Sequence, residues 1–302
     1  MPPADGPVPS PPAGYASLTR RYGSRCHERE APRSDDRKGD GVDRRTARRR
    51  PTAHRPLLIT AVLALACGVA CAAPEPVPAP PPPGPPTAPG AVLDLTSWKL
   101  TLPTGPEGEP DELHPPDLLS FSGDWFRLND TLDGVVFTAP AGGVTTEGSS
   151  YPRAELRELD DGELASWSNR AGTHTMTVRE AITKLPEVKP HVVAAQIHDA
   201  EDDVVMVRLE GSHLFVEYDD GEGEFTLDPG YRLGTPFEVR ITAADGRVEV
   251  AYNGQVAGEV PLAGEGWYFK AGTYTQSNPE RGEAPDAVGE VVIYALDVTH
   301  TP

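Results

Sequence analysis

The chain is poor in cysteine, and its few cysteines lie close to its beginning. Only Cys26, Cys67 and Cys71 occur among the 302 residues. Residues 72–302 contain none, so this part of the chain must fold without disulfides, even in an oxidising compartment that permits them. The same absence excludes the cysteine-containing zinc patterns.

Histidines at metal-ligand spacing are missing as well. Five histidines have no partner at such a spacing: His114, His174, His191, His213 and His300. The acidic segments 199–203 and 219–224 are typical of solvated loops rather than of calcium sites. We therefore expect no metal ligand and no cofactor in this protein.

Long apolar runs and helical periodicity are also scarce. No helical period persists over ten residues, and the apolar stretch within residues 57–73 is shorter than the ~20 residues that span a bilayer. This stretch follows a basic segment and ends in small residues, as a secretory signal does. We expect an exported, extracellular protein without a membrane-spanning helix.

Four segments of different composition divide the chain. Residues 1–56 are basic and unpatterned, which predicts a disordered leader or a start assigned too far upstream. The apolar signal region 57–73 is followed by a proline-rich linker, 74–90, and by one domain, 91–302.

The end of the signal region leaves two routes open. Cys67 follows Ala-Leu-Ala and is therefore a candidate lipid anchor at the cell surface. Cleavage after Ala72 would instead release a secreted protein.

The charge is distributed unevenly. Of the 27 Lys and Arg residues, 13 lie in residues 1–56 with 7 of the 46 Asp and Glu residues, which leaves residues 57–302 with a formal charge of −25. Such an excess argues against nucleic acid as a partner. Because salt screens charges beyond about 8–10 Å, a local basic groove still admits an anionic substrate.

Strand and turn patterns fill the domain. The expected strands are His174–Ile182, His191–Ile197, Val204–Leu209, Leu214–Tyr218, Phe237–Ala243, Val248–Tyr252 and Val288–Asp297. Asp245-Gly246 and Asn253-Gly254 predict hairpin turns. Single helical turns are expected near Pro116–Leu119 and Asp161–Trp167. We predict an all-β sandwich of two antiparallel sheets with one concave face, in a monomer.

Three short segments alternate polar and apolar residues: Arg153-Ala-Glu155-Leu-Arg157, Gln196-Ile-His198 and Tyr268-Phe-Lys270-Ala-Gly-Thr-Tyr274-Thr-Gln276. In a strand, this spacing puts every polar side chain on one face. The opposite face receives residues that suit a core, namely Ala154, Leu156, Val193, Ala195, Ile197, Phe269 and Ala271. A face rich in arginine, lysine, histidine, glutamine and tyrosine is poor core and suits an acidic sugar.

The same three segments, with Tyr151 and Pro152 before the first, resemble the signatures of alginate lyases of polysaccharide lyase family 7. Leu93–Gly105 is also similar to the first strand of that family, and the resemblance covers about residues 91–300. It implies a β-jelly roll with a substrate groove and an endo-acting enzyme that needs no redox cofactor. The implied partner is alginate, an anionic polysaccharide.

Elimination in a 4-linked uronate removes H5 and expels O4, so the site must neutralise the adjacent carboxylate while negative charge develops. The resemblance assigns this neutralisation to Arg153 and Gln196, and proton transfer to His198 and Tyr274. In guluronate, where H5 and O4 lie anti, His198 is the base and Tyr274 the acid; in mannuronate Tyr274 serves as both.

The remaining polar residues of the motifs receive supporting roles. Arg157, Lys270 and Gln276 are expected to bind substrate, and Tyr268 to line the groove. Glu155 is expected to hold Arg153 and Arg157 in place. Ile197 is the family variant associated with guluronate-containing substrates.

Other readings stay open. Glu158-Leu-Asp160-Asp-Gly-Glu163 loosely resembles the carboxylate motif of retaining β-glucan hydrolases, although Asp161-Gly162 predicts a turn that separates its members. A non-catalytic carbohydrate-binding jelly roll is a second alternative. A lyase acting on another polyuronate, such as glucuronan, is a third.

Overall fold

A computed structural model describes residues 84–302 of the chain. The predicted leader, signal region and candidate anchor Cys67 lie outside the described residues, as do the other two cysteines and linker residues 74–83. Among residues 84–302, no helix is both long and apolar enough to cross a membrane.

The described residues form strands joined by turns and short helical segments. In chain order the elements are 3₁₀ turn Pro89–Ala91, β1 (Trp98–Thr101), β2 (Glu112–Leu113), α1 (Asp117–Ser120), β3 (Phe126–Leu128), β4 (Val135–Pro140), β5 (Arg153–Asp160), β6 (Glu163–Leu164), β7 (Thr173–Lys184), β8 (His191–His198), β9 (Asp203–Glu210), β10 (His213–Tyr218), β11 (Gly223–Asp228), β12 (Phe237–Ala244), β13 (Arg247–Tyr252), β14 (Gln255–Val260), β15 (Tyr268–Thr275), 3₁₀ turn Pro279–Arg281 and β16 (Val288–Thr301).

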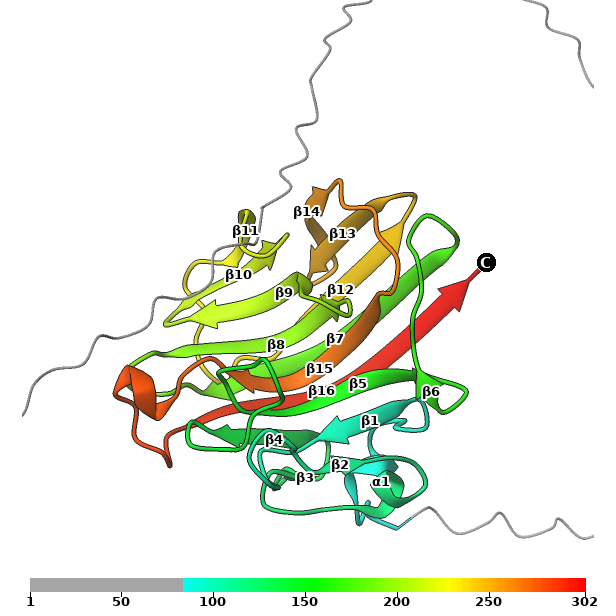
Figure 1. Ribbon diagram of the computed structural model, residues 1–302. Coiled ribbons are helices and arrows are strands. Elements are labelled where there is room, and N and C mark those ends of the chain that lie inside the picture. Colours follow the sequence, from blue (N-terminus) through cyan, green and yellow to red (C-terminus); the bar gives the residue numbers. More distant parts are fainter. Residues whose placement is uncertain (1–83) are drawn as a thin grey trace, which may run out of the picture. The chain divides into compact units, whose positions relative to one another are not determined.

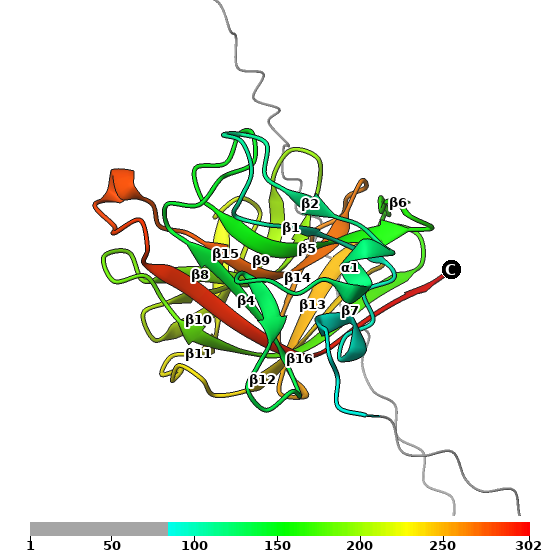
Figure 2. The ribbon, with the colours of Figure 1, turned by 90° about the horizontal axis from the view of Figure 1, so that it is seen from below.

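Two antiparallel sheets lie against each other as the layers of a sandwich (Figure 1). Sheet A has the strand order β11-β10-β9-β8-β15-β5-β1-β2, with β6 paired to β5, and sheet B has the order β14-β13-β12-β7-β16-β4-β3. The view from below shows strands of both sheets curving around a shared interior (Figure 2). Strands far apart in sequence are neighbours in both sheets, and the predicted jelly-roll sandwich is confirmed.

The hairpin turns follow from local backbone preference. Asp245-Gly246 joins β12 to β13, and Asn253-Gly254 joins β13 to β14; all four residues have positive φ angles. Two-residue turns with both φ values positive match the twist of the flanking strands. Both predicted hairpins are therefore confirmed.

The core lies between the sheets and is built from alternating apolar residues of both. Leu156, Ile197 and Phe269 of sheet A are fully buried there, as are Phe137 and Ile293 of sheet B. One face of each central strand is thus committed to the core, and the polar face of sheet A is left for the site.

Two local predictions are wrong. Val193 was expected on the core face with Ala195, but irregular pairing between Ala271 and Tyr274 shifts the register and places Val193 opposite Tyr274. Cross-strand partners share a face of the sheet, so Val193 lies on the same side as that tyrosine.

The second error concerns residues 161–167, for which a helical turn was expected. Asp161 and Gly162 form a tight turn with positive φ angles, β6 follows, and Trp167 pairs with Trp267 in an isolated bridge. Strand pairing of the flanking residues outweighs the weak local preference for a helical turn. The other expected helical turn is confirmed as α1, displaced by one residue.

Glu180 of β7 is an ionisable residue buried among apolar side chains. It is fully buried, its neighbours across the sheet are Phe237 and Ile293, and neither carboxyl oxygen has a hydrogen-bond partner among the described residues. Burial raises the pKa of Glu180 from the ordinary 4.5 to about 8. The folded protein therefore holds a proton that the unfolded chain releases near its ordinary pKa.

This proton makes stability depend on pH. The free energy of unfolding should fall as pH rises from 4.5 to about 8. Glu180→Gln cannot ionise, so we expect it to raise stability at pH 8 by roughly 1–3 kcal/mol and to change it little at pH 5. Denaturant unfolding at both pH values measures this, with exposed Glu238→Gln as the control. An equal effect of Glu180→Gln at both pH values would refute the explanation.

Candidate functional site

The polar face of sheet A lines a cavity of about 360 Å³. Its floor crosses β1, β5, β15 and β8, and the loop before β5 and the loop after β8 border it. The cavity is lined by Lys99, Thr101, Glu112, Thr146, Glu147, Gly148, Ser149, Arg153, Arg157, Gln196, His198, Ala200, Glu201, Asp202, Asp203, Tyr268, Lys270 and Tyr274. Three polar motifs separated along the chain therefore meet at one surface.

Strand register explains why they meet. Tyr274 lies opposite Arg153, and Lys270 lies between Arg157 on β5 and Gln196 on β8. Tyr268 continues the same face and lies opposite His198. Because directly opposed residues share a face, the alternation seen in each strand becomes one continuous surface.

Gly272 fits its position because two backbones come close together there. Its φ of 141° is rarely adopted by other residues, and a Cβ atom would lie 2.6 Å from the Ala154 carbonyl oxygen and 2.9 Å from the Glu155 Cα atom. A side chain would push β15 away from β5.

The buried carboxylate of Glu155 organises the cavity floor. Its Oε2 atom lies 2.5 Å from Lys270 Nζ and 3.2 Å from Arg153 Nη1, and its Oε1 atom accepts a hydrogen bond from Gln196 Nε2. Arg157 is not among these partners, so this half of the prediction for Glu155 is wrong. Glu155 instead orients Lys270 and Gln196 as well as Arg153.

Burial and charge act against each other in this group. Burial alone raises the pKa of Glu155, but the positive charges of Lys270 and Arg153 outweigh it and hold that pKa below its ordinary value. Burial, with the positive charge of Arg153, lowers the pKa of Lys270 to about 8. The floor therefore carries net positive charge at neutral pH.

Arg157 has a different partner. Its guanidinium carbon lies 3.8 Å from the centroid of the Tyr268 ring, a cation–π geometry. The Tyr268 hydroxyl donates to the Asp199 carbonyl oxygen at 2.9 Å. The ring thus fixes Arg157 beside the cavity without neutralising its charge.

The protonation of His198 follows from its contacts. Its Nδ1 atom lies 2.6 Å from the Asp199 carbonyl oxygen, which can only accept, so Nδ1 carries the proton and Nε2 has the lone pair. Burial, with the positive charges of Lys270 and Arg153, lowers the pKa of His198 below 6.5. At neutral pH the ring is therefore uncharged and can accept a proton.

Tyr274 lies between a cation and a hydroxyl group. The Arg153 guanidinium carbon is 4.0 Å from the centroid of the Tyr274 ring, and Ser149 Oγ is 3.1 Å from the phenol oxygen. The phenol ring therefore lies under a guanidinium group, and its oxygen atom lies within hydrogen-bond distance of a hydroxyl group.

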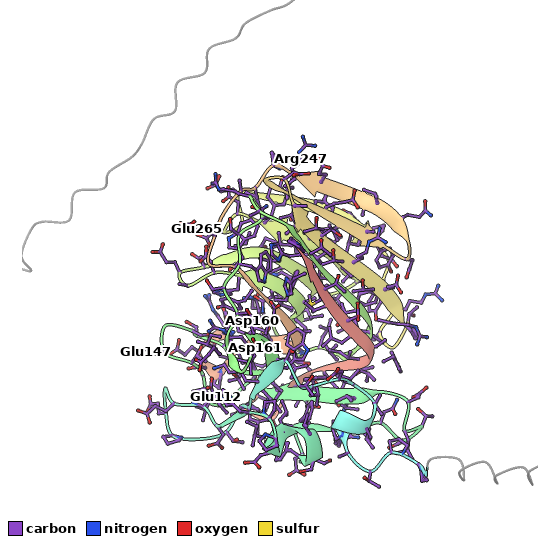
Figure 3. All side chains as sticks on the ribbon, turned by 90° about the vertical axis from the view of Figure 1, so that its right-hand side faces the viewer. Glu112, Glu147, Asp160, Asp161, Arg247 and Glu265 are labelled. Carbon is purple, nitrogen blue, oxygen red and sulfur yellow. The ribbon has the colours of Figure 1, made fainter. Side chains whose placement is uncertain are left out.

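Some cavity residues were not predicted. Lys99 of β1 lies opposite Arg157 and forms an ion pair with Glu112 at 2.5 Å; the alternation in Trp98-Lys-Leu-Thr101 was the available signal. Ser149 and Glu147 come from a loop without a strand pattern, and no local signal marks them. Figure 3 shows Glu112 and Glu147 on one side of the molecule, with Arg247 at the far end.

The structure does not bring Gln276 into this group. It follows β15, is buried, and is absent from the cavity lining. Its backbone N–H donates to the His191 carbonyl oxygen at 3.1 Å. Substrate binding by Gln276 stays a prediction.

Carboxylates gather at one end of the cavity. Asp202, Asp203 and Asp220 have oxygen atoms within 4.8 Å of one another. Burial, with the negative charges of Asp202 and Glu217, raises the pKa of Asp203 to about 6. Exposed acidic groups of this kind are common without an ion, and the expectation of no metal stays a prediction.

The hydrolase-like carboxylates do not form a site. Glu158 follows Arg157 in β5 and so points to the opposite face of the sheet. Its oxygen atoms accept from Trp167 Nε1 and the Phe269 N–H, and pair with His300. Glu163 lies beyond the turn on β6. The predicted turn at Asp161-Gly162 is confirmed, but the predicted scattering of the carboxylates is wrong, because Asp160 and Glu163 are partners across that turn.

The cavity combines the elements that polyuronate elimination requires. Arg153, Gln196 and Lys270 can stabilise a carboxylate, a neutral imidazole can accept a proton, and a phenol can donate one. All three functions lie on adjacent strands of one face.

Comparisons with known proteins agree with this chemistry. A family profile described as alginate lyase matches residues 93–300. Alginate lyase AlgAT5 of polysaccharide lyase family 7 is 53% identical, with a TM-score of 0.69, and the match covers 72% of this chain and 100% of that chain. An alginate lyase from Corynebacterium sp. is 46% identical, with the same TM-score and coverage.

A more distant relative extends the match. An alginate lyase of Klebsiella pneumoniae is 26% identical over an alignment of 285 positions, and the match covers 70% of this chain and 91% of that protein. The family profile spans nearly all of the described sandwich, including the three polar motifs. The chain therefore belongs to polysaccharide lyase family 7 and is an alginate lyase.

Proposed function

We propose that this alginate lyase is exported, acts within the polymer, and favours guluronate-containing blocks. The observation that carries the proposal is the uncharged His198 ring beside a cationic floor, with the Tyr274 phenol on the neighbouring strand. Arg153, Gln196, His198 and Tyr274 are the proposed catalytic residues.

Charge neutralisation precedes bond breaking in this scheme. Removal of H5 places negative charge next to the uronate carboxylate. One N–H group of Arg153 donates to Glu155, and its other donors can bind the substrate. The Gln196 amide donates one proton to Glu155 and can donate its second proton to the substrate. Because Glu155 already holds both side chains, they require little reorganisation as charge develops.

Proton transfer then involves two side chains, one that accepts H5 and one that protonates O4. In guluronate, His198 Nε2 takes H5 and Tyr274 gives its phenol proton to O4. The C4–O4 bond breaks as the C4=C5 bond forms, and exchange with solvent restores both side chains. The neutral His198 ring suits this anti arrangement, which supports guluronate as the favoured substrate.

Action within the polymer is supported by a row of polar side chains across the strands. Lys99, Arg157, Lys270 and Gln196 are successive cross-strand partners on β1, β5, β15 and β8. Neighbouring strands are about 4.8 Å apart, so the row presents three cationic side chains and one amide at a repeated spacing. A polyuronate lying along it can place several carboxylates on the floor at once.

Two parts of the proposal rest on sequence. Export rests on the signal-like region 57–73. Lipidation of Cys67 would anchor the protein to the cell surface, whereas cleavage after Ala72 would release it. The guluronate preference also draws on Ile197, which is fully buried behind the cavity floor and acts only through packing.

The reaction leaves an absorbing product. Mixing the protein separately with polyguluronate, polymannuronate and glucuronan should raise ultraviolet absorbance fastest with polyguluronate, because elimination conjugates C4=C5 with the carboxyl group. A faster rise with another polymer would overturn the proposed preference. New reducing ends without absorbance would indicate hydrolysis, and binding alone would indicate a carbohydrate-binding module.

Tyr274→Phe tests the proposed acid. The variant keeps the ring beneath Arg153 and removes only the hydroxyl, so we expect kcat on polyguluronate to fall by about 10²–10⁴-fold while oligosaccharide binding persists. Tyr151→Phe is the matched control, because its hydroxyl contacts Lys189 at 3.1 Å and does not line the cavity. Activity retained in Tyr274→Phe would remove Tyr274 from the mechanism.

The acid side of the pH profile tests the proposed base. Since the pKa of His198 lies below 6.5, the acid limb of kcat/KM on polyguluronate should have its midpoint below pH 6.5. Asp203 titrates in a similar range, and Asp203→Asn should leave the limb in place. A midpoint at or above 6.5, or its disappearance in Asp203→Asn, would contradict the role of His198.

A further inference from the structure

One hydroxyl outside the polar motifs touches two of the proposed catalytic residues. Ser149 lies in the loop between β4 and β5 and lines the cavity. Its Oγ atom is 3.1 Å from Tyr274 Oη and 3.2 Å from Arg153 Nη2. Its significance rests on the proposed role of Tyr274 as the acid.

The hydrogen bonds of Ser149 assign its proton. Arg153 Nη2 and the Tyr151 backbone N–H can only donate, and both lie 3.2 Å from Oγ, so they occupy its two lone pairs. The single hydroxyl proton has two acceptors at 3.1 Å, the Tyr151 carbonyl oxygen and the Tyr274 phenol oxygen. Because both Ser149 lone pairs are occupied, the Tyr274 hydroxyl cannot donate its proton to Ser149. In the contact between the two residues, Ser149 is therefore the donor.

This arrangement couples the hydroxyl to the charge on Tyr274. While the phenol is neutral, the Ser149 proton can rest on the Tyr151 carbonyl oxygen and leave the phenol proton free for O4. When the phenol loses its proton, a charge-assisted bond to the phenolate becomes the stronger choice. Rotation of one O–H bond moves the Ser149 proton from one acceptor to the other.

We propose that Ser149 is a positioning residue that links Arg153 to Tyr274. Its hydroxyl, polarised by Arg153, donates a hydrogen bond to the phenolate that forms when O4 departs and so stabilises that phenolate. Arg153 polarises the hydroxyl through Nη2 and also stacks over the phenol ring at 4.0 Å. Arg153 thus contacts the face of the Tyr274 ring directly and contacts the phenol oxygen through the Ser149 hydroxyl.

Other charged groups lie near this tyrosine, and they stay unchanged when only Ser149 is replaced. The Tyr151 ring meets the Tyr274 ring edge-on at 6.3 Å, and Lys189 lies over the Tyr151 ring. The titratable or charged groups facing Tyr274 and Ser149 are Arg153 of β5, Lys270 of β15, His198 of β8, Tyr151 and Glu147 of the loop, and Lys189 through Tyr151.

The test compares kcat and KM of Ser149→Ala, Ser149→Thr and Ser150→Ala on polyguluronate. Ser150 is the matched control, because it is exposed in the same loop and its hydroxyl makes no hydrogen bond to any residue between 84 and 302. We expect Ser149→Ala to lower kcat by about 10–100-fold with KM within about two-fold.

Ser149→Thr, which keeps the hydroxyl, should recover most of the rate, and Ser150→Ala should match the parent protein. A raised KM with unchanged kcat in Ser149→Ala, or no recovery of kcat in Ser149→Thr, would overturn the proposal and indicate that Ser149 only shapes the loop. Tyr274→Phe distinguishes a failure of the proposed function from a failure of the Ser149 proposal. If Tyr274→Phe stays active, Tyr274 is not the acid. If Tyr274→Phe is inactive while Ser149→Ala has the kcat of the parent protein, only the proposed role of Ser149 is wrong.

Discussion

A buried carboxylate organises the reactive face of this protein. Glu155 lies inside the sheet surface and is almost inaccessible to water, a position that is costly for a charge unless partners surround it. Lys270, Arg153 and Gln196 supply those partners from three different strands. The requirement to satisfy one anion therefore fixes the positions of three groups for which we propose roles in the reaction.

The Glu155 carboxylate is paired with two cations, so the cavity floor keeps a net positive charge. Two cations share the carboxylate, so the floor attracts a uronate although the chain as a whole is strongly acidic. Burial, together with neighbouring positive charges, also lowers the pKa of Lys270 to about 8 and keeps His198 uncharged at neutral pH. Attraction of the substrate and availability of a neutral base thus arise from the same cluster.

The back of the same strands holds this face in place. The Thr273 and Thr275 hydroxyls each donate at 2.8 Å to carbonyl oxygens of β4 in the other sheet, those of Phe137 and Ala139. Gly272, which precedes Thr273, lets β5 approach β15 closely. Tyr274 is therefore carried on a strand tied to both layers, whereas Ser149 reaches it from a loop.

Much of the fold and part of the site follow from local patterns. Alternation in Arg153–Arg157, Gln196–His198 and Tyr268–Tyr274 assigns residues to faces because the side-chain period of a strand is two. The turns at Asp245-Gly246 and Asn253-Gly254 follow because aspartate, asparagine and glycine tolerate positive φ angles. These features depend on neighbours in sequence, so the sequence by itself determines them.

Other features depend on which strands become neighbours, and only the tertiary structure decided them. The register shift that turns Val193 toward Tyr274, and the choice of Lys270 rather than Arg157 as the partner of Glu155, arise from pairing across the sheet. The contact between Ser149 and Tyr274 joins residues 125 positions apart. Such contacts leave no periodic trace in either segment, because their geometry is set by packing of distant strands and loops.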